Sequence, residues 1–278
     1  MESLMARKMW RTLEPYHGMI YFVPEAPAAY ATLGVTGLDG YFASRSAPMG
    51  AVPAEVVVAS FFNFDPRVVH AAIPAAWSLA SPAQLVDARF RAADDALRRV
   101  LGDRVENPSV TRAVELARIA AGGCTAPGRP LFAAHASLAW PSPPHLALWH
   151  AISLLREFRG DGHICCLVEA GLDGIDALVL HAASAEVPRA VLQGSRHWDD
   201  LAWEESIARL RGRGLVHADG TFTEAGAALR QHIEERTDAL ALAPWAAVGE
   251  PGCDELRHLV RPLSKAIVAA GTFGALPT

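Results

Sequence analysis

Charged and titratable side chains are concentrated between His150 and His163, where the sequence reads HAISLLREFRGDGH. Arg156 and Arg159 are three residues apart, so they lie on one face of the amphipathic helix that the apolar spacing predicts. Guanidinium groups bind anions strongly, and a histidine titrates near neutral pH. The segment therefore predicts an anion site beside a proton-transfer group. The alternative is a salt-bridged helix corner in which Arg159 pairs with Glu157.

The elements expected to position these side chains are two helices that meet near Gly160. The first helix is expected to end at Gly160, and Asp161 is a good N-cap for the second, which Gly171 would close. A helix N-terminus offers unpaired N–H groups and a partial positive charge. The junction itself would therefore favour a bound anion.

A second set of candidate residues comes from an internal correspondence. His17 and His150 each precede a Gly-Leu-Asp-Gly motif, and the matching positions lie 133 to 135 residues apart. The other corresponding pairs are Val-Pro at 52–53 and 187–188, and Phe-Asp at 64–65 with Trp-Asp at 198–199. The pattern predicts two related halves packed about a pseudo-twofold axis. The alternative is coincidence in an alanine-rich helical protein.

Polar side chains from both halves would then meet in one cleft. The predicted catalytic residues are His163, Asp161, His150 and His17, and the predicted substrate-binding residues are Arg156, Arg159, Tyr16, Tyr21, Glu25, Arg45 and Asn63. Histidine, carboxylate and arginine together suit an acid–base step on an anionic small molecule, such as an elimination or an intramolecular displacement. His163 or His150 would move the proton. The alternative is that the histidines are hydrogen-bonded core residues.

Motifs for metals and cofactors are missing from the sequence. It contains no HExxH, no CxxC, no phosphate-binding glycine loop and no GxSxG. We therefore expect no metal and no cofactor. The four cysteines, Cys124, Cys165, Cys166 and Cys253, are expected to be reduced and mostly buried.

Composition indicates a globular protein, since 51% of the 278 residues are hydrophobic and 20% are charged. The net charge of −5 disfavours nucleic-acid binding. No apolar run reaches membrane-spanning length and no signal peptide is recognisable, so a cytoplasmic protein without membrane contact is expected. We predict a first half at 1–121, a linker rich in Gly and Pro at 122–145, and a second half at 146–278.

The segment 176–243 resembles a winged helix-turn-helix domain of the MarR type. The residues that carry the resemblance are Leu210, the run 213–216, the hairpin tip Asp219-Gly220, and the helix start at 223–226. The whole chain is similar to an actinobacterial helix-turn-helix family, which implies a fold but no activity. The expected fold is mainly α, with two pseudo-repeated helical halves, the second a winged helix-turn-helix with a small β-wing.

In such domains the helix before the wing enters the DNA major groove. Here that helix begins with Asp199 and Asp200 and continues with Glu204 and Glu205, which would repel phosphates. The leading hypothesis is therefore a cofactor-independent enzyme on a winged-helix scaffold, with DNA an unlikely partner. The alternatives are a ligand-responsive DNA-binding transcription regulator and a non-catalytic partner subunit. A homodimer stays open.

Overall fold

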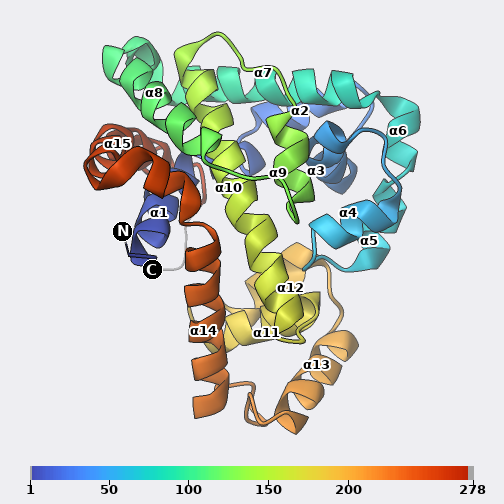
Figure 1. Cartoon of the computed structure of the whole chain (residues 1–278). Coiled ribbons are helices and arrows are strands. Elements are labelled where there is room, and N and C mark those ends of the chain that lie inside the picture. The colour runs from blue at the N-terminus through green and yellow to red at the C-terminus, as the bar shows by residue number, and fades with distance from the viewer. Residues whose placement is uncertain (1, 275–278) are drawn as a thin grey trace.

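The structure, a computed structural model, describes residues 2–274, and this part of the chain is helical without a β-strand (Figure 1). The expected mainly α fold is confirmed. The helices are α1 (Leu4–Gly18), α2 (Glu25–Ala31), α3 (Gly37–Ser46), α4 (Ala54–Ser60), α5 (Pro66–Ala72), α6 (Ala75–Leu79), α7 (Pro82–Leu101), α8 (Pro108–Gly122), α9 (Pro130–Ala136), α10 (Pro144–Glu169), α11 (Gly174–Ala183), α12 (Arg189–Arg196), α13 (Asp200–Gly212), α14 (Glu224–Leu240) and α15 (Ala243–Ala269). Within 2–274, no helix is both long and apolar enough to span a membrane.

Helix α10 runs through the molecule without interruption (Figure 1). The predicted helix end at Gly160 is therefore wrong. Asp161 does not cap a second helix; its carboxylate accepts a hydrogen bond of 2.9 Å from the backbone N–H of Phe132, in α9. The Asp161 carboxylate is thus bonded to the backbone of α9 and not to the backbone of its own helix, and Asp161 lies in the interior of α10. The C-terminal prediction is confirmed, because Gly171 has φ of +65° and closes α10.

The side chains of α10 are divided between a larger core, a smaller core and a third, minor cluster that contains Leu154 and Phe158. The larger core contains Leu97, Leu148 and Val260, and it joins the N-terminal helices, the first half of α10 and α15. We call these elements the bundle. The smaller core contains Trp203 and Leu210 and draws on the far end of α10. We call residues 174–240, from α11 to α14, the small unit.

Several helix boundaries follow from local capping. The sequence Ser81-Pro82 predicts a helix start, and Ser81 and Gln84 form a capping box at the start of α7. Asp199 accepts from the N–H of Ala202 at 2.8 Å and caps α13. Thr223 caps α14 through a 3.0 Å bond from the N–H of Gly226. These three N-terminal boundaries match the sequence interpretation.

The predicted wing is a short turn. Val216 and Phe222 form one isolated antiparallel bridge, and no strand forms within residues 2–274. The turn is closed by a 2.8 Å bond from the N–H of His217 to the carbonyl of Thr221. A sheet-forming wing and the pseudo-repeat therefore stay predictions, as do the domain boundaries. The segment 122–145 contains helix α9, and the larger core draws on helices from both sides of that segment.

Candidate functional site

A cavity of about 190 Å³ lies where the bundle meets the small unit. It opens beside a larger groove of about 700 Å³, and both are lined by Tyr41, Arg156 and Arg196. The predicted residues Arg45, Asn63, Asp161 and His163 also line the smaller cavity. The structure thus places five of the predicted site residues, Arg45, Asn63, Arg156, Asp161 and His163, around one space.

The centre of this cluster is Glu157, which is 1% exposed. Its carboxylate accepts from Nε and Nη2 of Arg45 at 3.2 and 2.9 Å, and from Nη1 of Arg156 at 2.9 Å. Burial raises the pKa of Glu157, but Arg156 and Arg45 outweigh burial and hold it well below its usual range. The alternative pairing of Arg159 with Glu157 is wrong, because Arg159 faces the opposite side of α10.

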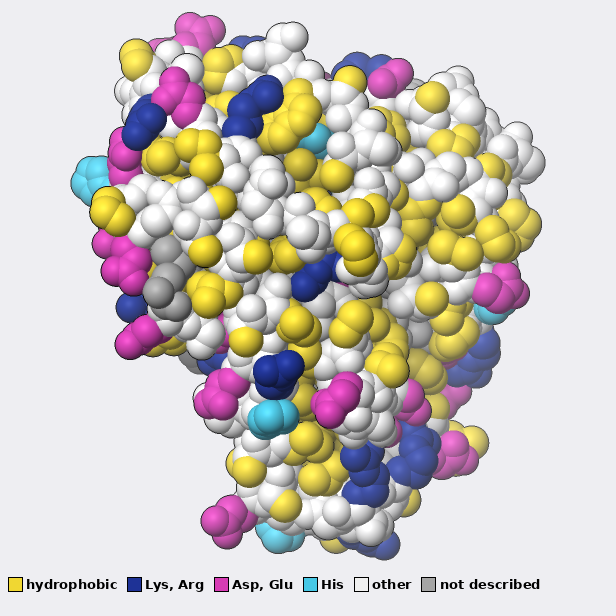
Figure 2. Space-filling view, viewed as in Figure 1, with side chains coloured by type: hydrophobic (Ala, Val, Ile, Leu, Met, Phe, Trp, Pro, Cys, Tyr) yellow, Lys and Arg dark blue, Asp and Glu magenta, His cyan; other side chains and the backbone are white. Residues whose placement is uncertain are grey.

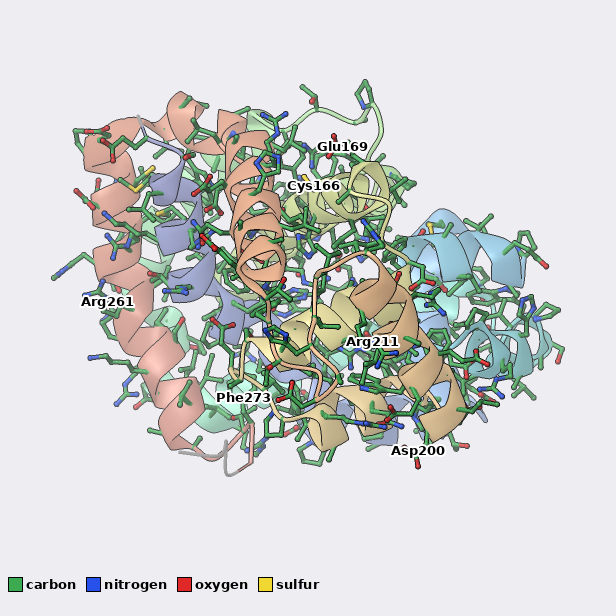
Figure 3. All side chains as sticks on the ribbon, turned by 90° about the horizontal axis from the view of Figure 1, so that it is seen from below. Cys166, Glu169, Asp200, Arg211, Arg261 and Phe273 are labelled. Atoms are coloured by element: carbon green, nitrogen blue, oxygen red, sulfur yellow. The ribbon has the colours of Figure 1, made fainter. Side chains whose placement is uncertain are left out.

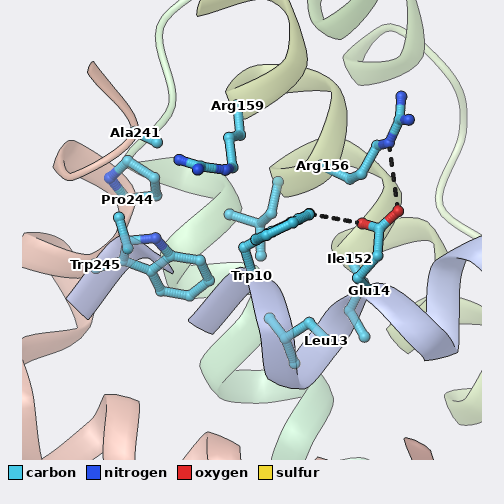
Figure 4. A pocket seen from close by; sticks show the side chains of 11 residues that line it. Trp10, Leu13, Glu14, Ile152, Arg156, Arg159, Ala241, Pro244 and Trp245 are labelled. Carbon is cyan, nitrogen blue, oxygen red and sulfur yellow. Dashed lines mark hydrogen bonds and ion pairs between the residues drawn. The ribbon is translucent and has the colours of Figure 1, made fainter. Parts of the chain in front are cut away.

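Figure 4 shows the neighbouring small pocket, where Trp10 and Glu14 from α1 face Arg156. Glu14 accepts from the indole Nε1 of Trp10 at 3.0 Å and lies 3.8 Å from Arg156. Burial raises the pKa of Glu14, and Arg156 opposes that shift. Arg156 is therefore held from two sides by carboxylates of α1 and α10.

His163 and Arg159 line an open groove of about 510 Å³ between α1, α10 and α14, which adjoins the smaller cavity and shares Arg156 and His163 with it. Arg159 pairs with Asp238 at 2.8 Å. The Nδ1 atom of His163 is hydrogen-bonded to Thr237 Oγ1 at 2.9 Å. Burial is the main cause that lowers the pKa of His163, to about 4. A neutral imidazole with that pKa is a poor proton donor at pH 7.

His17 is enclosed in the bundle and is not exposed. Its ring is hydrogen-bonded to Ser153 Oγ at 2.8 Å and to Tyr21 Oη at 3.1 Å. Burial lowers its pKa well below the usual range. Tyr16 donates to the carbonyl of His145 at 3.1 Å. The alternative of hydrogen-bonded core residues therefore describes His17 and Tyr16, while Tyr21 also reaches the larger groove.

The remaining predicted residues do not converge with His17. The ring of His150 packs edge-on against Trp140, with 4.9 Å between centroids, and shares no hydrogen-bond partner with His17. Glu25 pairs with Arg99 on the bundle surface. Asn63 acts through its backbone, whose carbonyl accepts from Trp198 Nε1 at 3.0 Å. The predicted single cleft joining both histidines is not formed, because His17 packs against Ser153 and Trp149 whereas the ring of His150 packs against Trp140.

Sequence reasoning missed Arg196, the last residue of α12. Its guanidinium lies 4.6 Å from the ring centroid of Phe64, and its backbone carbonyl accepts from the N–H of Asp65 at 3.0 Å. The internal correspondence between Phe64-Asp65 and Trp198-Asp199 could have directed attention to Arg196, because Trp198 lies two residues after it and Phe64 contacts it. Arg67 joins these pairs physically, since it bonds to Asp65 and lies 2.7 Å from Asp199.

The second candidate surface is the outer face of α13 in the small unit. Trp203, Ser206 and Leu210 are buried and hold the helix, while Leu201 and Glu205 are exposed. Figure 3 views the molecule from this end and shows Asp200 and Arg211 near opposite ends of α13. In Figure 2, acidic and basic side chains are interspersed over this end of the molecule.

Most arginines of the small unit are occupied by neighbours. Arg189 pairs with Glu204 at 2.6 Å and with Asp200 at 3.2 Å. Arg209 pairs with Asp176 at 2.8 Å, and Arg213 donates to backbone carbonyls at the end of α10. Within residues 2–274, Arg211 has no hydrogen bond or ion pair, so its charge is free to meet a partner.

A helix-turn-helix family model matches residues 6–274, and the chain belongs to this helix-turn-helix family. The chain has no significant match among curated proteins or among solved structures. Membership overturns two expectations from the sequence. The family points to DNA-binding regulators and gives no support for an enzyme acting on a small-molecule substrate. The expectation that DNA is an unlikely partner is therefore wrong as well. The acidic start of α13 misled the charge argument, since part of that charge is neutralised by Arg189.

Proposed function

We propose that the protein is a DNA-binding transcription regulator whose helix-turn-helix consists of α12 and α13. The observation that carries the proposal is the exposed outer face of α13, at one end of a chain that belongs to a helix-turn-helix family. Three buried side chains fix the inner face of α13, so the outer face is presented in one orientation. A recognition helix needs this arrangement to bring side chains to base edges in the major groove.

The charge of the small unit favours base contacts over phosphate contacts. Residues 174–240 contain seven arginines and eleven carboxylates, and most of the arginines are already paired. A carboxylate can accept a hydrogen bond from the N4 amino group of cytosine. Glu205, exposed on α13, is the residue that we assign to this contact. Each phosphate contact contributes about −0.9 to the slope of log K against log salt concentration, so few contacts imply a shallow slope.

The finer assignments rest on the sequence resemblance. We propose that the small unit is of the MarR type, with the turn at 215–223 in the place of the wing. The actinobacterial origin and the descent of the two halves, 1–121 and 146–278, from a duplicated ancestor belong to the same proposal. The hairpin tip and the cap of α14 support the first of these assignments.

The test is a selection of duplexes from a random-sequence library with the full chain, followed by affinity measurements at two salt concentrations. We expect an enriched sequence with cytosines at positions facing α13. Arg211→Ala is expected to weaken binding to every sequence and to reduce the salt slope by about one. Arg261→Ala is the matched control, because Arg261 lies on α15, away from α13 (Figure 3). Absence of any enriched sequence, or equal effects of both variants, would refute the proposal.

A further inference from the structure

The cavity between the bundle and the small unit carries an excess of positive charge. Four arginines line it. Arg45 and Arg156 pair with Glu157, Arg156 also lies near Glu14, and Arg230 lies near Glu186 and Glu234, so that within residues 2–274 only Arg196 has no carboxylate partner. The carboxylate of Asp161 accepts from the backbone N–H of Phe132 at 2.9 Å and forms no ion pair with these arginines in the described part of the chain. Charges removed from water are costly unless they are paired. The imbalance therefore requires an explanation beyond packing.

Arg196 accounts for most of the imbalance. Its only hydrogen-bond acceptors within the described chain are the carbonyl of Ser195 at 3.4 Å and the hydroxyl of the same residue at 3.2 Å. Its Nε is buried without a partner. Burial lowers the pKa of this guanidinium, and Arg45 and Arg156 act in the same direction. An anion in the cavity would oppose the effects of burial, of Arg45 and of Arg156 on the charge of Arg196.

The surrounding walls are aromatic. Phe61 and Phe64 line the smaller cavity, and the adjoining groove adds Tyr21 and Phe22. Such walls bury the flat apolar body of a ligand, while a few polar groups fix its orientation. The chemistry of the whole space therefore matches a molecule with an aromatic body and one anionic group.

We propose that this cavity binds an aromatic anion, a carboxylate or a sulfonate, whose charged group is held by Arg196 and Arg156. The ligand is an effector and undergoes no reaction. Its aromatic body lies against Phe64 and Tyr41, at the mouth of the larger groove.

Occupancy of the cavity would regulate DNA binding, a step that rests on the proposed function. Arg196 is the last residue of α12, directly before the turn into α13. That turn is bonded to the α4–α5 loop through the Trp198 to Asn63 bond, and to the first turn of α5 through the Arg67–Asp199 pair of 2.7 Å. A bound anion that attracts the Arg196 guanidinium can therefore change the position of the turn between α12 and α13. A ligand shifts a conformational equilibrium by its difference in affinity for the two states.

The binding test uses naphthalene-2-sulfonate and its neutral counterpart naphthalene-2-methanol, with calorimetric titration of the full chain. Arg196→Gln removes the charge, Arg196→Lys keeps it, and Arg98→Gln removes an exposed charge on α7 as the control. We expect the wild type and Arg98→Gln to bind the sulfonate and not the alcohol. Arg196→Gln should bind at least about tenfold more weakly, as the loss of a charge-assisted hydrogen bond predicts, and Arg196→Lys should restore part of the affinity.

Thermal unfolding without ligand separates this role from a structural one. Because Arg196 has no carboxylate partner among residues 2–274, Arg196→Gln is expected to leave the melting temperature unchanged or raised. Equal binding of sulfonate and alcohol, or unchanged sulfonate affinity in Arg196→Gln, would overturn the ligand site. A clear fall in the melting temperature of Arg196→Gln would identify Arg196 as a structural residue and would also overturn the ligand site.

The regulatory step is tested with the selected DNA duplex. We expect the sulfonate to change duplex affinity in the wild type and not in Arg196→Gln. A saturating sulfonate that leaves the duplex affinity of the wild type unchanged would overturn the regulatory step alone. If the chain selects no duplex, the proposed function and the regulatory step both fail, and the titration still decides whether the cavity binds an anion.

Discussion

Replacement of Glu157 by glutamine would remove the buried carboxylate that the buried Arg45 and the partly buried Arg156 share. The glutamine has the same shape, so the change is confined to charge and to hydrogen bonds. Three bonds of 2.9 to 3.2 Å from Arg45 and Arg156 are affected. Removing one partner of a buried ion pair costs about 3–5 kcal/mol, because the other charge is left uncompensated. We expect a loss of that size in the free energy of unfolding.

The measurement is urea unfolding followed by circular dichroism at pH 7. The matched control is Glu115→Gln, which also removes a carboxylate that bonds an arginine, Arg112, at 2.9 Å. Glu115 is 58% exposed, so its loss should cost no more than about 1 kcal/mol. Equal effects of the two variants, or a loss below about 1 kcal/mol for Glu157→Gln, would refute the reasoning about buried charge.

The same variant has a defined pH dependence. The pKa of Glu157 is lower in the folded protein than its ordinary value of 4.5, so the unfolded chain takes up the proton first as the pH falls. Its stabilising contribution is therefore complete above pH 4.5 and declines as the pH falls through the folded pKa. The gap between wild type and Glu157→Gln should narrow over that range. The variant should also bind naphthalene-2-sulfonate more tightly, since the cavity has lost a negative charge.

Three further predictions concern other parts of the molecule. Burial lowers the pKa of His150 from 6.5 to about 4, so wild-type stability should fall as the pH drops below 6.5, and His150→Gln should reduce that slope in pH-dependent urea unfolding by up to about 1.4 kcal/mol per pH unit. A Cβ at Gly174 would lie 2.0 Å from the carbonyl oxygen of Phe62, so Gly174→Ala should lower the free energy of unfolding by about 1–3 kcal/mol, whereas Gly194→Ala, with open space around it, should not lower it. Glu205→Gln should change the base preferred at one position in a repeated duplex selection, and an identical selected sequence would remove Glu205 from base reading.

Local signals in the sequence were sufficient for much of the fold. The capping residues Ser81, Asp199 and Thr223 each act within three residues of their own position, so the sequence alone located those helix starts. The predicted break in α10 failed for the opposite reason. Asp161 has the side chain of a cap, but its partner is the backbone of Phe132, a long way off in the sequence.

The candidate site was only partly predictable because its components come from distant segments. Arg156 was found because its charged neighbours are adjacent in the sequence. Arg196 was missed because the ring and the cavity that define its surroundings are formed by residues 61–64 and by α10. The acidic run at the start of α13 was misleading, since Asp200 and Glu204 are paired with Arg189, an earlier residue in the chain.

Helix α10 belongs to both hydrophobic cores, and its 26 residues extend over about 39 Å. A fragment that begins at residue 174 would lack Cys166 and Leu167, which complete the smaller core. A fragment that begins at residue 144 would carry Leu148 and Ile152 into water without the N-terminal helices of the bundle that cover them. Recombination at either point yields a chain with an incomplete core. The small unit and the bundle must therefore be exchanged between genes, or engineered into fusions, as one inseparable piece.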